Sequence, residues 1–271
     1  MALSGWSDAN YIEHGSAAAL DDMTVGTVAY WLYTTSDTAR QAIMSKFGTT
    51  TARGLSLSEQ ASPSTLDWQI GRLTTANAIV ADLANFAYYA INKWLFVVCC
   101  FDSVTSGNNK MYIGDLTHVA AEPSAYTTQA AGSGGFLSDA TGNWRVGRHA
   151  TATGRQFVGS IATQYVADRV LTVGEIAQLQ FSGRITSQLS IIASTHYGYN
   201  GATGSQIDWT GRGNHGTVTG TPTLAAHAPI GPMFGINRHS AYFVAGGGGP
   251  SFNAAWATAA NTVIHSGAMA A

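Results

Sequence analysis

The feature that most restricts the fold of this 271-residue chain is a series of short apolar and aromatic segments separated by turn-forming residues. β-Branched and aromatic residues, which strands favour, dominate Val25–Tyr33, and Thr65–Gly71 alternates apolar with polar side chains. Lys93–Asp102 is a nearly continuous apolar run, which predicts a central strand covered on both faces. Further strands are predicted at Ala42–Lys46, Leu55–Ser58, Lys110–Ile113, Asn143–Val146 and Gln156–Val166. Many short strands predict an all-β sandwich of two sheets.

Helical signals are few. Thr172 stands where an N-cap is expected and Glu175 follows three residues later, which is the spacing of a capping box. A helix over Thr172–Gln180 would direct Ile176 and Leu179 inward together. Ile185–Ser194 is a candidate for a second short helix, so the sandwich is expected to carry one or two.

Composition excludes several classes of protein. Charged residues make up 10% of the chain, against about 25% in typical soluble domains. This scarcity argues against a long helical bundle, and a net charge of −2 without a basic cluster argues against nucleic-acid binding. Because soluble monomers usually carry more surface charge, we expect other protein subunits to cover part of the surface, as in a homo-oligomer; the alternative is a surface rich in Ser, Thr, Asn and Gly.

No targeting or membrane segment is predicted. Met1–Asn10 has neither the basic nor the apolar region of a signal peptide. The longest run of large apolar residues, Trp94–Phe101, is far shorter than the roughly 18 residues of a membrane helix. Within it, Cys99 and Cys100 are neighbours on a strand and would point to opposite faces, which predicts two reduced thiols.

Several segments occur in an order that is informative as a whole. They are AYWLY (29–33), KWLFVVCCFD (93–102), MYIGD (111–115), NWRVGR (143–148), FVGSIA (157–162) and ADRVLTVGEIAQL (167–179). In this order they resemble the laminin-G-like, concanavalin A-like jelly roll. Asp208–Pro222, followed by His227 and Pro229, is similar to a segment that closes such jelly rolls in phage- and prophage-associated proteins. The resemblance implies a two-sheet antiparallel jelly roll over residues 1–230.

Residues 231–271 differ in composition from the rest of the chain. They contain a glycine break at Gly246–Pro250, many small residues and scattered aromatic residues, with almost no charge. A disordered tail is usually charged or lacks large aromatic residues. We therefore expect an extended C-terminal arm that binds a neighbouring subunit through aromatic anchors. The predicted partner-binding residues are Phe234, Tyr242, Phe243, Phe252 and Trp256.

Catalytic motifs are not found. Glycanases of this fold carry glutamates and an aspartate close together on one strand, whereas the adjacent carboxylates here, Asp21–Asp22, are predicted to lie in a solvated turn. The nucleophile elbow, the P-loop and the zinc-protease helix motif are also missing. We therefore expect no enzyme activity and no cofactor other than calcium, which jelly rolls of this kind often hold at their loops.

Two loops carry oxygen ligands of the type that calcium prefers. Asp102, Asn108 and Asn109 flank one hairpin, and Asp139 and Asn143 lie on another loop. The alternative is that these side chains bond their own backbone as Asx turns. In the same way, Asp208 is expected to cap exposed N–H groups of its glycine-rich loop.

Two functional hypotheses follow. The main one is a non-enzymatic virion protein of a tailed phage, such as a capsid decoration, made in the host cytoplasm and held on the particle exterior by contacts with the major capsid protein. The alternative is a lectin-like module, for example on a tail fibre, that binds a surface glycan. Candidates for stacking on a sugar are Tyr112, Tyr126 and Trp144, whereas Trp31, Trp68 and Trp94 are expected in the core.

Overall fold

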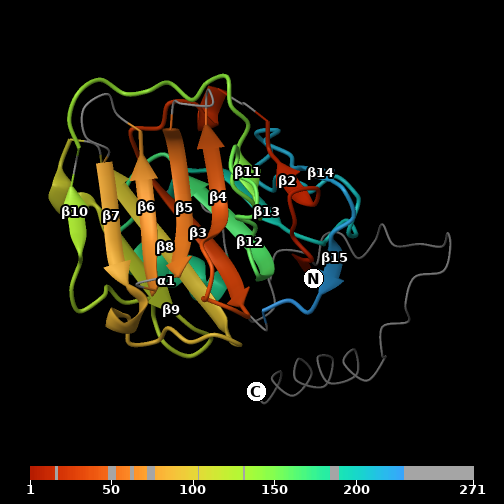
Figure 1. Ribbon diagram of the computed structural model, residues 1–271, viewed down its shortest axis with the longest axis horizontal. Helices are drawn as coiled ribbons and strands as arrows, with labels where there is room; N and C mark the ends of the chain where they lie inside the picture. The colour runs from red at the N-terminus through yellow and green to blue at the C-terminus, as the bar shows by residue number, and fades with distance from the viewer. Residues whose placement is uncertain are drawn as a thin grey trace, which may run out of the picture. The chain divides into compact units, whose positions relative to one another are not determined.

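A computed structural model describes residues 1–15, 18–47, 53–61, 64–71, 77–102, 104–130, 132–183 and 189–228. Within these ranges, fifteen strands form two antiparallel sheets packed face to face (Figure 1). The seven-stranded sheet has the order β15-β1-β12-β3-β8-β9, with β13 also paired to β12. The eight-stranded sheet has the order β10-β7-β6-β5-β4-β11-β2-β14.

The strands of the seven-stranded sheet are β1 (Ala2–Ser4), β3 (Val25–Thr34), β8 (Trp94–Asp102), β9 (Lys110–Gly114), β12 (Gly159–Ala167), β13 (Ile191–His196) and β15 (Thr223–Ala225). Those of the eight-stranded sheet are β2 (Tyr11–Glu13), β4 (Gln41–Phe47), β5 (Arg53–Ala61), β6 (Ser64–Ile70), β7 (Asn77–Asp82), β10 (Thr128–Ala130), β11 (Arg145–Val146) and β14 (Thr217–Thr219). The helical elements are η1 (Ala18–Leu20), η2 (Leu83–Asn85), η3 (Ser106–Asn108) and α1 (Val173–Ser182). Every strand segment predicted from the sequence is found as a strand, which confirms the predicted two-sheet sandwich.

The predicted second helix is wrong. Residues 184–188 lie outside the described part, and Ile191–His196 forms β13, which pairs with β12 in antiparallel register. Its burial is complete along its length, because one face meets the space between the sheets and the other faces a second apolar cluster. A run such as IIAST, buried on both faces, is stabilised by sheet pairing rather than by helical periodicity.

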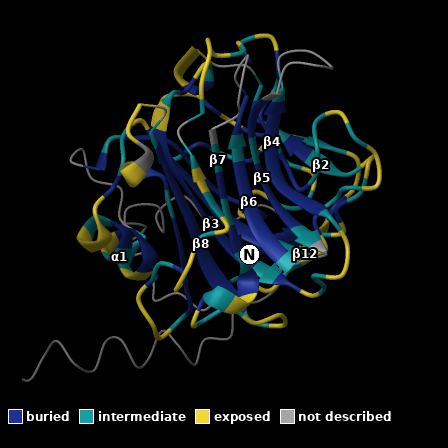
Figure 2. Ribbon diagram, turned by 60° about the vertical axis from the view of Figure 1, so that its left-hand side comes forward, coloured by how far each residue is buried: buried dark blue, intermediate teal, exposed yellow. Residues whose placement is uncertain are grey.

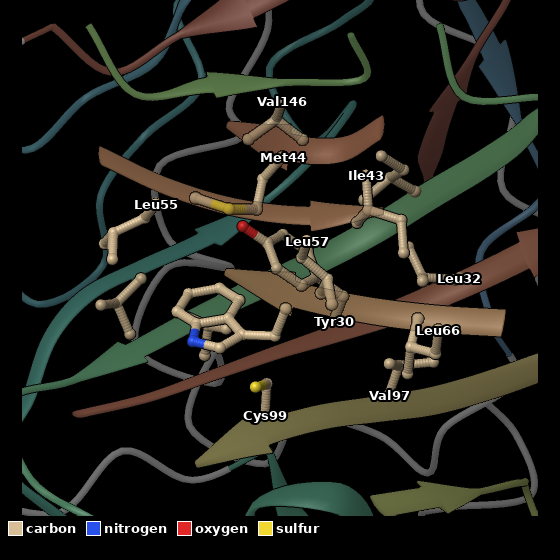
Figure 3. Packing of buried hydrophobic residues seen from close by; sticks show 14 of the residues in the cluster. Tyr30, Leu32, Ile43, Met44, Leu55, Leu57, Leu66, Val97, Cys99 and Val146 are labelled. Carbon is tan, nitrogen blue, oxygen red and sulfur yellow. The ribbon is translucent and has the colours of Figure 1, made fainter. Parts of the chain in front are cut away.

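The main core fills the space between the two sheets. Alternate residues of each strand point inward, so Leu57 and Trp68 of the eight-stranded sheet meet Tyr30 and Val97 of the seven-stranded sheet. Figure 3 shows Leu57 directed toward Tyr30 and Val97 from the opposite layer. Trp68 stacks on Phe101 of β8 with ring centroids 4.8 Å apart. Trp31 and Trp68 are fully buried and Trp94 is nearly so, as predicted.

A second core covers the outer face of the seven-stranded sheet. There, Trp31, Phe96 and Tyr165 pack with Ile176 and Leu179 of α1. Figure 2 shows buried strands behind α1, whose opposite face is exposed. The two thiols are free and buried on opposite faces, as expected: that of Cys99 lies between the sheets and that of Cys100 lies in the second core.

The predicted arm, residues 231–271, lies outside the described residues together with Phe234, Tyr242, Phe243, Phe252 and Trp256. Their roles therefore stay predictions. Among the helices that the structure describes, none is long and apolar enough to cross a membrane.

Candidate functional site

The outer face of the eight-stranded sheet is the broad sheet surface that no described helix covers, and Figure 1 looks onto it. Strand alternation sends the leucines of β5 inward, so the serines between them point outward. Strand register aligns the outward residues in two rows across the sheet, which we call the polar face. The first row is Glu13, Arg145, Ser45, Ser56, Gln69 and Ala78, and the second is Ala42, Ser58, Asp67 and Val80.

A carboxylate–amide cluster lies on β5, β6 and β7 of the polar face. The Asp67 Oδ2 atom accepts hydrogen bonds from Gln60 Nε2 at 2.5 Å and from Gln69 Nε2 at 3.0 Å. These bonds fix the orientation of both amide groups. On β7, the Asp82 Oδ1 atom is buried and receives no hydrogen bond from any residue that the structure describes. The cluster therefore presents oriented donors and acceptors, including one acceptor that lacks a donor.

An aromatic pair borders the polar face at the end of β4. The rings of Phe47 and His149 lie 4.8 Å apart between centroids, and both side chains are partly exposed. The segment after β11 is held against the sheet because Ala150 donates its backbone N–H to Ser45 Oγ at 2.6 Å. Beyond it, the Arg145 and Arg148 guanidinium groups lie 5.2 and 4.9 Å from the centroid of the Tyr11 ring. The remaining part of the polar face is the surface of β4 to β7, where the central side chains are packed: Ser58 and Asp67 are 3% and 2% exposed, while Gln60, Gln69 and Asp82 are partly exposed.

The aromatic residues predicted to stack on sugar do not lie on this surface. Trp144 has no exposed surface and lies between the sheets, where its indole nitrogen donates to Gln164 Oε1 at 3.0 Å. Tyr112 is buried in the second core, and Tyr126 packs against the main core with its hydroxyl 2.9 Å from the backbone nitrogen of Met111. Trp144 is thus buried between the sheets and Tyr112 in the second core, so the prediction for these two residues is wrong.

The calcium candidates on the β8–β9 hairpin form an Asx turn. Asp102 Oδ1 accepts the backbone N–H groups of Val104 and Thr105 at 2.8 and 3.1 Å, and its Oδ2 accepts the Asn108 amide at 2.8 Å. The Asn109 side-chain oxygen accepts the Asp102 N–H at 2.7 Å. N–H donors thus surround the oxygens that a cation would need, and these residues do not fit a calcium site. Across the described ranges, no group of three or more His, Cys, Asp or Glu side chains is arranged to hold a metal ion.

The Asp21–Asp22 turn was predicted to be solvated, but both carboxylates bind other parts of the chain. The Asp21 carboxylate binds the Lys46 ammonium at 2.7 Å, and the Asp22 carboxylate accepts the backbone N–H of Asp139 at 2.9 Å. Asp208 does act as predicted: its two oxygens accept the N–H groups of Thr210 and Asn214, each at 3.0 Å.

No protein-family model and no curated protein sequence matches the chain. Solved structures do. A candidate carbohydrate-binding protein from Bacteroides ovatus matches with a TM-score of 0.53 and 17% identity, over 85% of this chain and 62% of that one. This chain folds as a concanavalin A-like jelly roll. Two others are similar: an SAP-like pentraxin from Limulus polyphemus (TM-score 0.48, 13% identity, 81% of this chain and 94% of that one) and the CBM40 domain of the Ruminococcus gnavus IT-sialidase with α2,3-sialyllactose (TM-score 0.44, 18% identity, 66% and 97%).

Proposed function

We propose that this jelly roll is a carbohydrate-binding module whose ligand lies across the polar face of the eight-stranded sheet. The observation that carries the proposal is the Gln60–Asp67–Gln69 cluster, in which a buried carboxylate holds two partly exposed amide groups in place on the polar face. Planar amides and carboxylates match the paired donors and acceptors of sugar hydroxyl groups. Ser58 and Ala78 are small, so no large side chain rises from the sheet at these two positions.

The border of the polar face supplies the apolar part of such a site. Carbohydrate rings have apolar faces that pack on aromatic side chains, and the Phe47–His149 pair stands at the edge of the open strands. The Bacteroides ovatus protein, which shares the fold, is itself a candidate carbohydrate-binding protein. That likeness supports the class of ligand, while the position of the site rests on this chain's own residues.

The charges on the polar face favour a neutral glycan. Asp67 and Asp82 supply carboxylates, and no lysine or arginine stands among the described side chains on the outer face of β5, β6 and β7. An acidic sugar would meet like charge there without a cation to pair with. We therefore expect neutral oligosaccharides to bind in preference to sialylated ones.

A glycan array followed by calorimetric titration of the full chain tests the proposal. Gln69→Ala removes one donor of the cluster and should weaken binding about fivefold, the value of one hydrogen bond of ~1 kcal/mol. Ser58→Trp places a bulky ring over the middle of the face and should abolish binding. Gln178→Ala, on the exposed side of α1, is the matched control and should bind as the wild type does.

The thermal midpoint of each variant shows whether the fold is retained. Equal affinities for the wild type, Gln69→Ala and Ser58→Trp would place the ligand elsewhere, and an array without any bound glycan would contradict the function itself.

The virion role and its exterior location stay predictions. They depend on residues 231–271, which lie outside the described part, and none of the solved structures named above is a virion protein. The two hypotheses are compatible, because a particle could carry a glycan-binding jelly roll on its surface.

A further inference from the structure

A buried ammonium group sits among carboxylates at the end of β4, near the upper edge of the eight-stranded sheet in Figure 1. Lys46 has no exposed surface, and strand register places it opposite Leu55 on the inner face. Its Nζ atom donates to Asp21 Oδ1 and Asp139 Oδ1, each at 2.7 Å, and to the Asp139 carbonyl oxygen at 2.8 Å. Three oxygens thus satisfy the three N–H donors of the ammonium.

The surroundings are built to hold this arrangement. A Cβ atom at Gly54 would lie 2.4 Å from the Asp139 Cβ and 2.5 Å from its Oδ2, so only glycine at this position of β5 leaves space for the Asp139 side chain. Asp22 and Asp139 exchange reciprocal bonds: each carboxylate accepts the other's backbone N–H, at 2.8 and 2.9 Å. Asp22 adopts a left-handed conformation (φ 51°) to do so.

Two carboxylates and a backbone carbonyl directed at one point are the ligand set of a hard divalent cation. The oxygens lie only a few tenths of an ångström farther from the Lys46 nitrogen than the ~2.4 Å typical of Ca²⁺–oxygen bonds. Two carboxylates this close, one buried and one 18% exposed, repel each other unless a cation lies between them, and here a side chain of the protein supplies that cation.

We propose that the Lys46 ammonium is a tethered counter-ion that fills a divalent-cation position. The hydrogen bonds of this ammonium connect β4 to the Asp21–Asp22 turn and to the loop around Asp139, so that no calcium ion is needed there. This inference is independent of glycan binding, because the Lys46 side chain faces inward while the polar face lies on the other side of the sheet.

Lys46→Ser tests the proposal, because serine removes the cation and opens the space that it fills. In this variant CaCl₂ should raise the thermal midpoint by about 4 °C or more over the value in EDTA, and calorimetry should show one Ca²⁺ site of roughly millimolar affinity. The wild type should show neither effect. Lys46→Met is the matched control: it removes the charge but keeps the side-chain volume, so calcium should not restore its stability.

The double variant Lys46→Ser/Asp139→Asn should lose the calcium effect that the single variant gains. If Lys46→Ser does not fold in EDTA, it is refolded from urea with and without CaCl₂, and folding in calcium alone supports the proposal. Failure to fold in both conditions, an unchanged midpoint in calcium, or stabilisation of the wild type by calcium would each overturn it.

Discussion

Glu59 is a carboxyl group held in the apolar space between the sheets, at the end of β5. It is 1% exposed and accepts hydrogen bonds from Thr34 Oγ1 at 3.2 Å and Gln41 Nε2 at 2.7 Å. Burial, aided by the nearby Asp37 charge, raises the pKa of Glu59 to about 8. The folded protein therefore keeps a proton that the unfolded chain releases above its ordinary value of 4.5.

The sign of the resulting pH dependence follows from linkage. The contribution of Glu59 to the free energy of unfolding is fully present below the unfolded pKa and is lost as pH rises toward the folded pKa, by up to about 4 kcal/mol. Glu59→Gln mimics the protonated form, so urea unfolding at about pH 5 and about pH 9 should show a smaller loss of stability than in the wild type. Glu122→Gln, a partly exposed glutamate beside Lys110, should behave as the wild type. Equal losses in all three proteins would contradict the raised pKa.

Single residues also show where prediction from sequence stops. The apolar surroundings of Trp31 and Trp68 were enough to place them in the core. Trp144 stands beside Arg145, which suggests a surface position, yet strand alternation buries the tryptophan and leaves the arginine partly exposed. The direction of a side chain depends on which partner strand fixes the register, and that information lies far away in the sequence.

At the scale of elements, the best-predicted one is α1, because its signals are local. Thr172 Oγ1 accepts the Glu175 N–H at 3.4 Å, and Glu175 Oε2 accepts the Thr172 N–H at 2.8 Å, so the predicted capping box is present. Thr172→Ala should destabilise the protein by ~1 kcal/mol and lower the thermal midpoint by roughly 2–4 °C. Thr172→Ser keeps the hydroxyl and should retain the wild-type midpoint. Equal losses in both variants would show that the methyl group, not the cap, is what matters.

The alternation of residues along single strands predicts that a polar face exists, but not which polar side chains meet on it. The pattern of Thr65–Gly71 indicated that apolar and polar side chains lie on opposite faces, which they do in β6, but Thr65 and Asp67 on the outer face are buried as well. That Asp67 meets Gln60 and Gln69, and that β7 adds Asp82 beside them, depends on strand register across the sheet. Likewise, the Asp139 loop reaches Lys46 across 93 residues of chain, a contact that no local pattern encodes.

At the scale of the whole molecule, the β signals of the separate segments predicted a two-sheet sandwich, and the resemblance of their order to concanavalin A-like domains predicted the jelly roll. The three-residue strands β1, β14 and β15 were not predicted, because so few residues leave little periodicity to detect. The solved structures confirm the architecture, while the site had to be built from contacts between distant segments.

The last prediction concerns residues 231–271. Every member of the two described cores precedes residue 229, so a chain that ends at Ile230 keeps both. If the five aromatic residues of the C-terminal segment bind a neighbouring subunit, the full chain should form a defined oligomer by light scattering, whereas the shortened chain should be monomeric. If both chains are monomers, the C-terminal segment does not bind a second copy of this protein. If both chains form the same oligomer, the subunit contact lies on the sandwich. If the polar face binds sugar, the full and the shortened chain should have the same glycan affinity. The same two proteins therefore test subunit assembly and glycan binding separately.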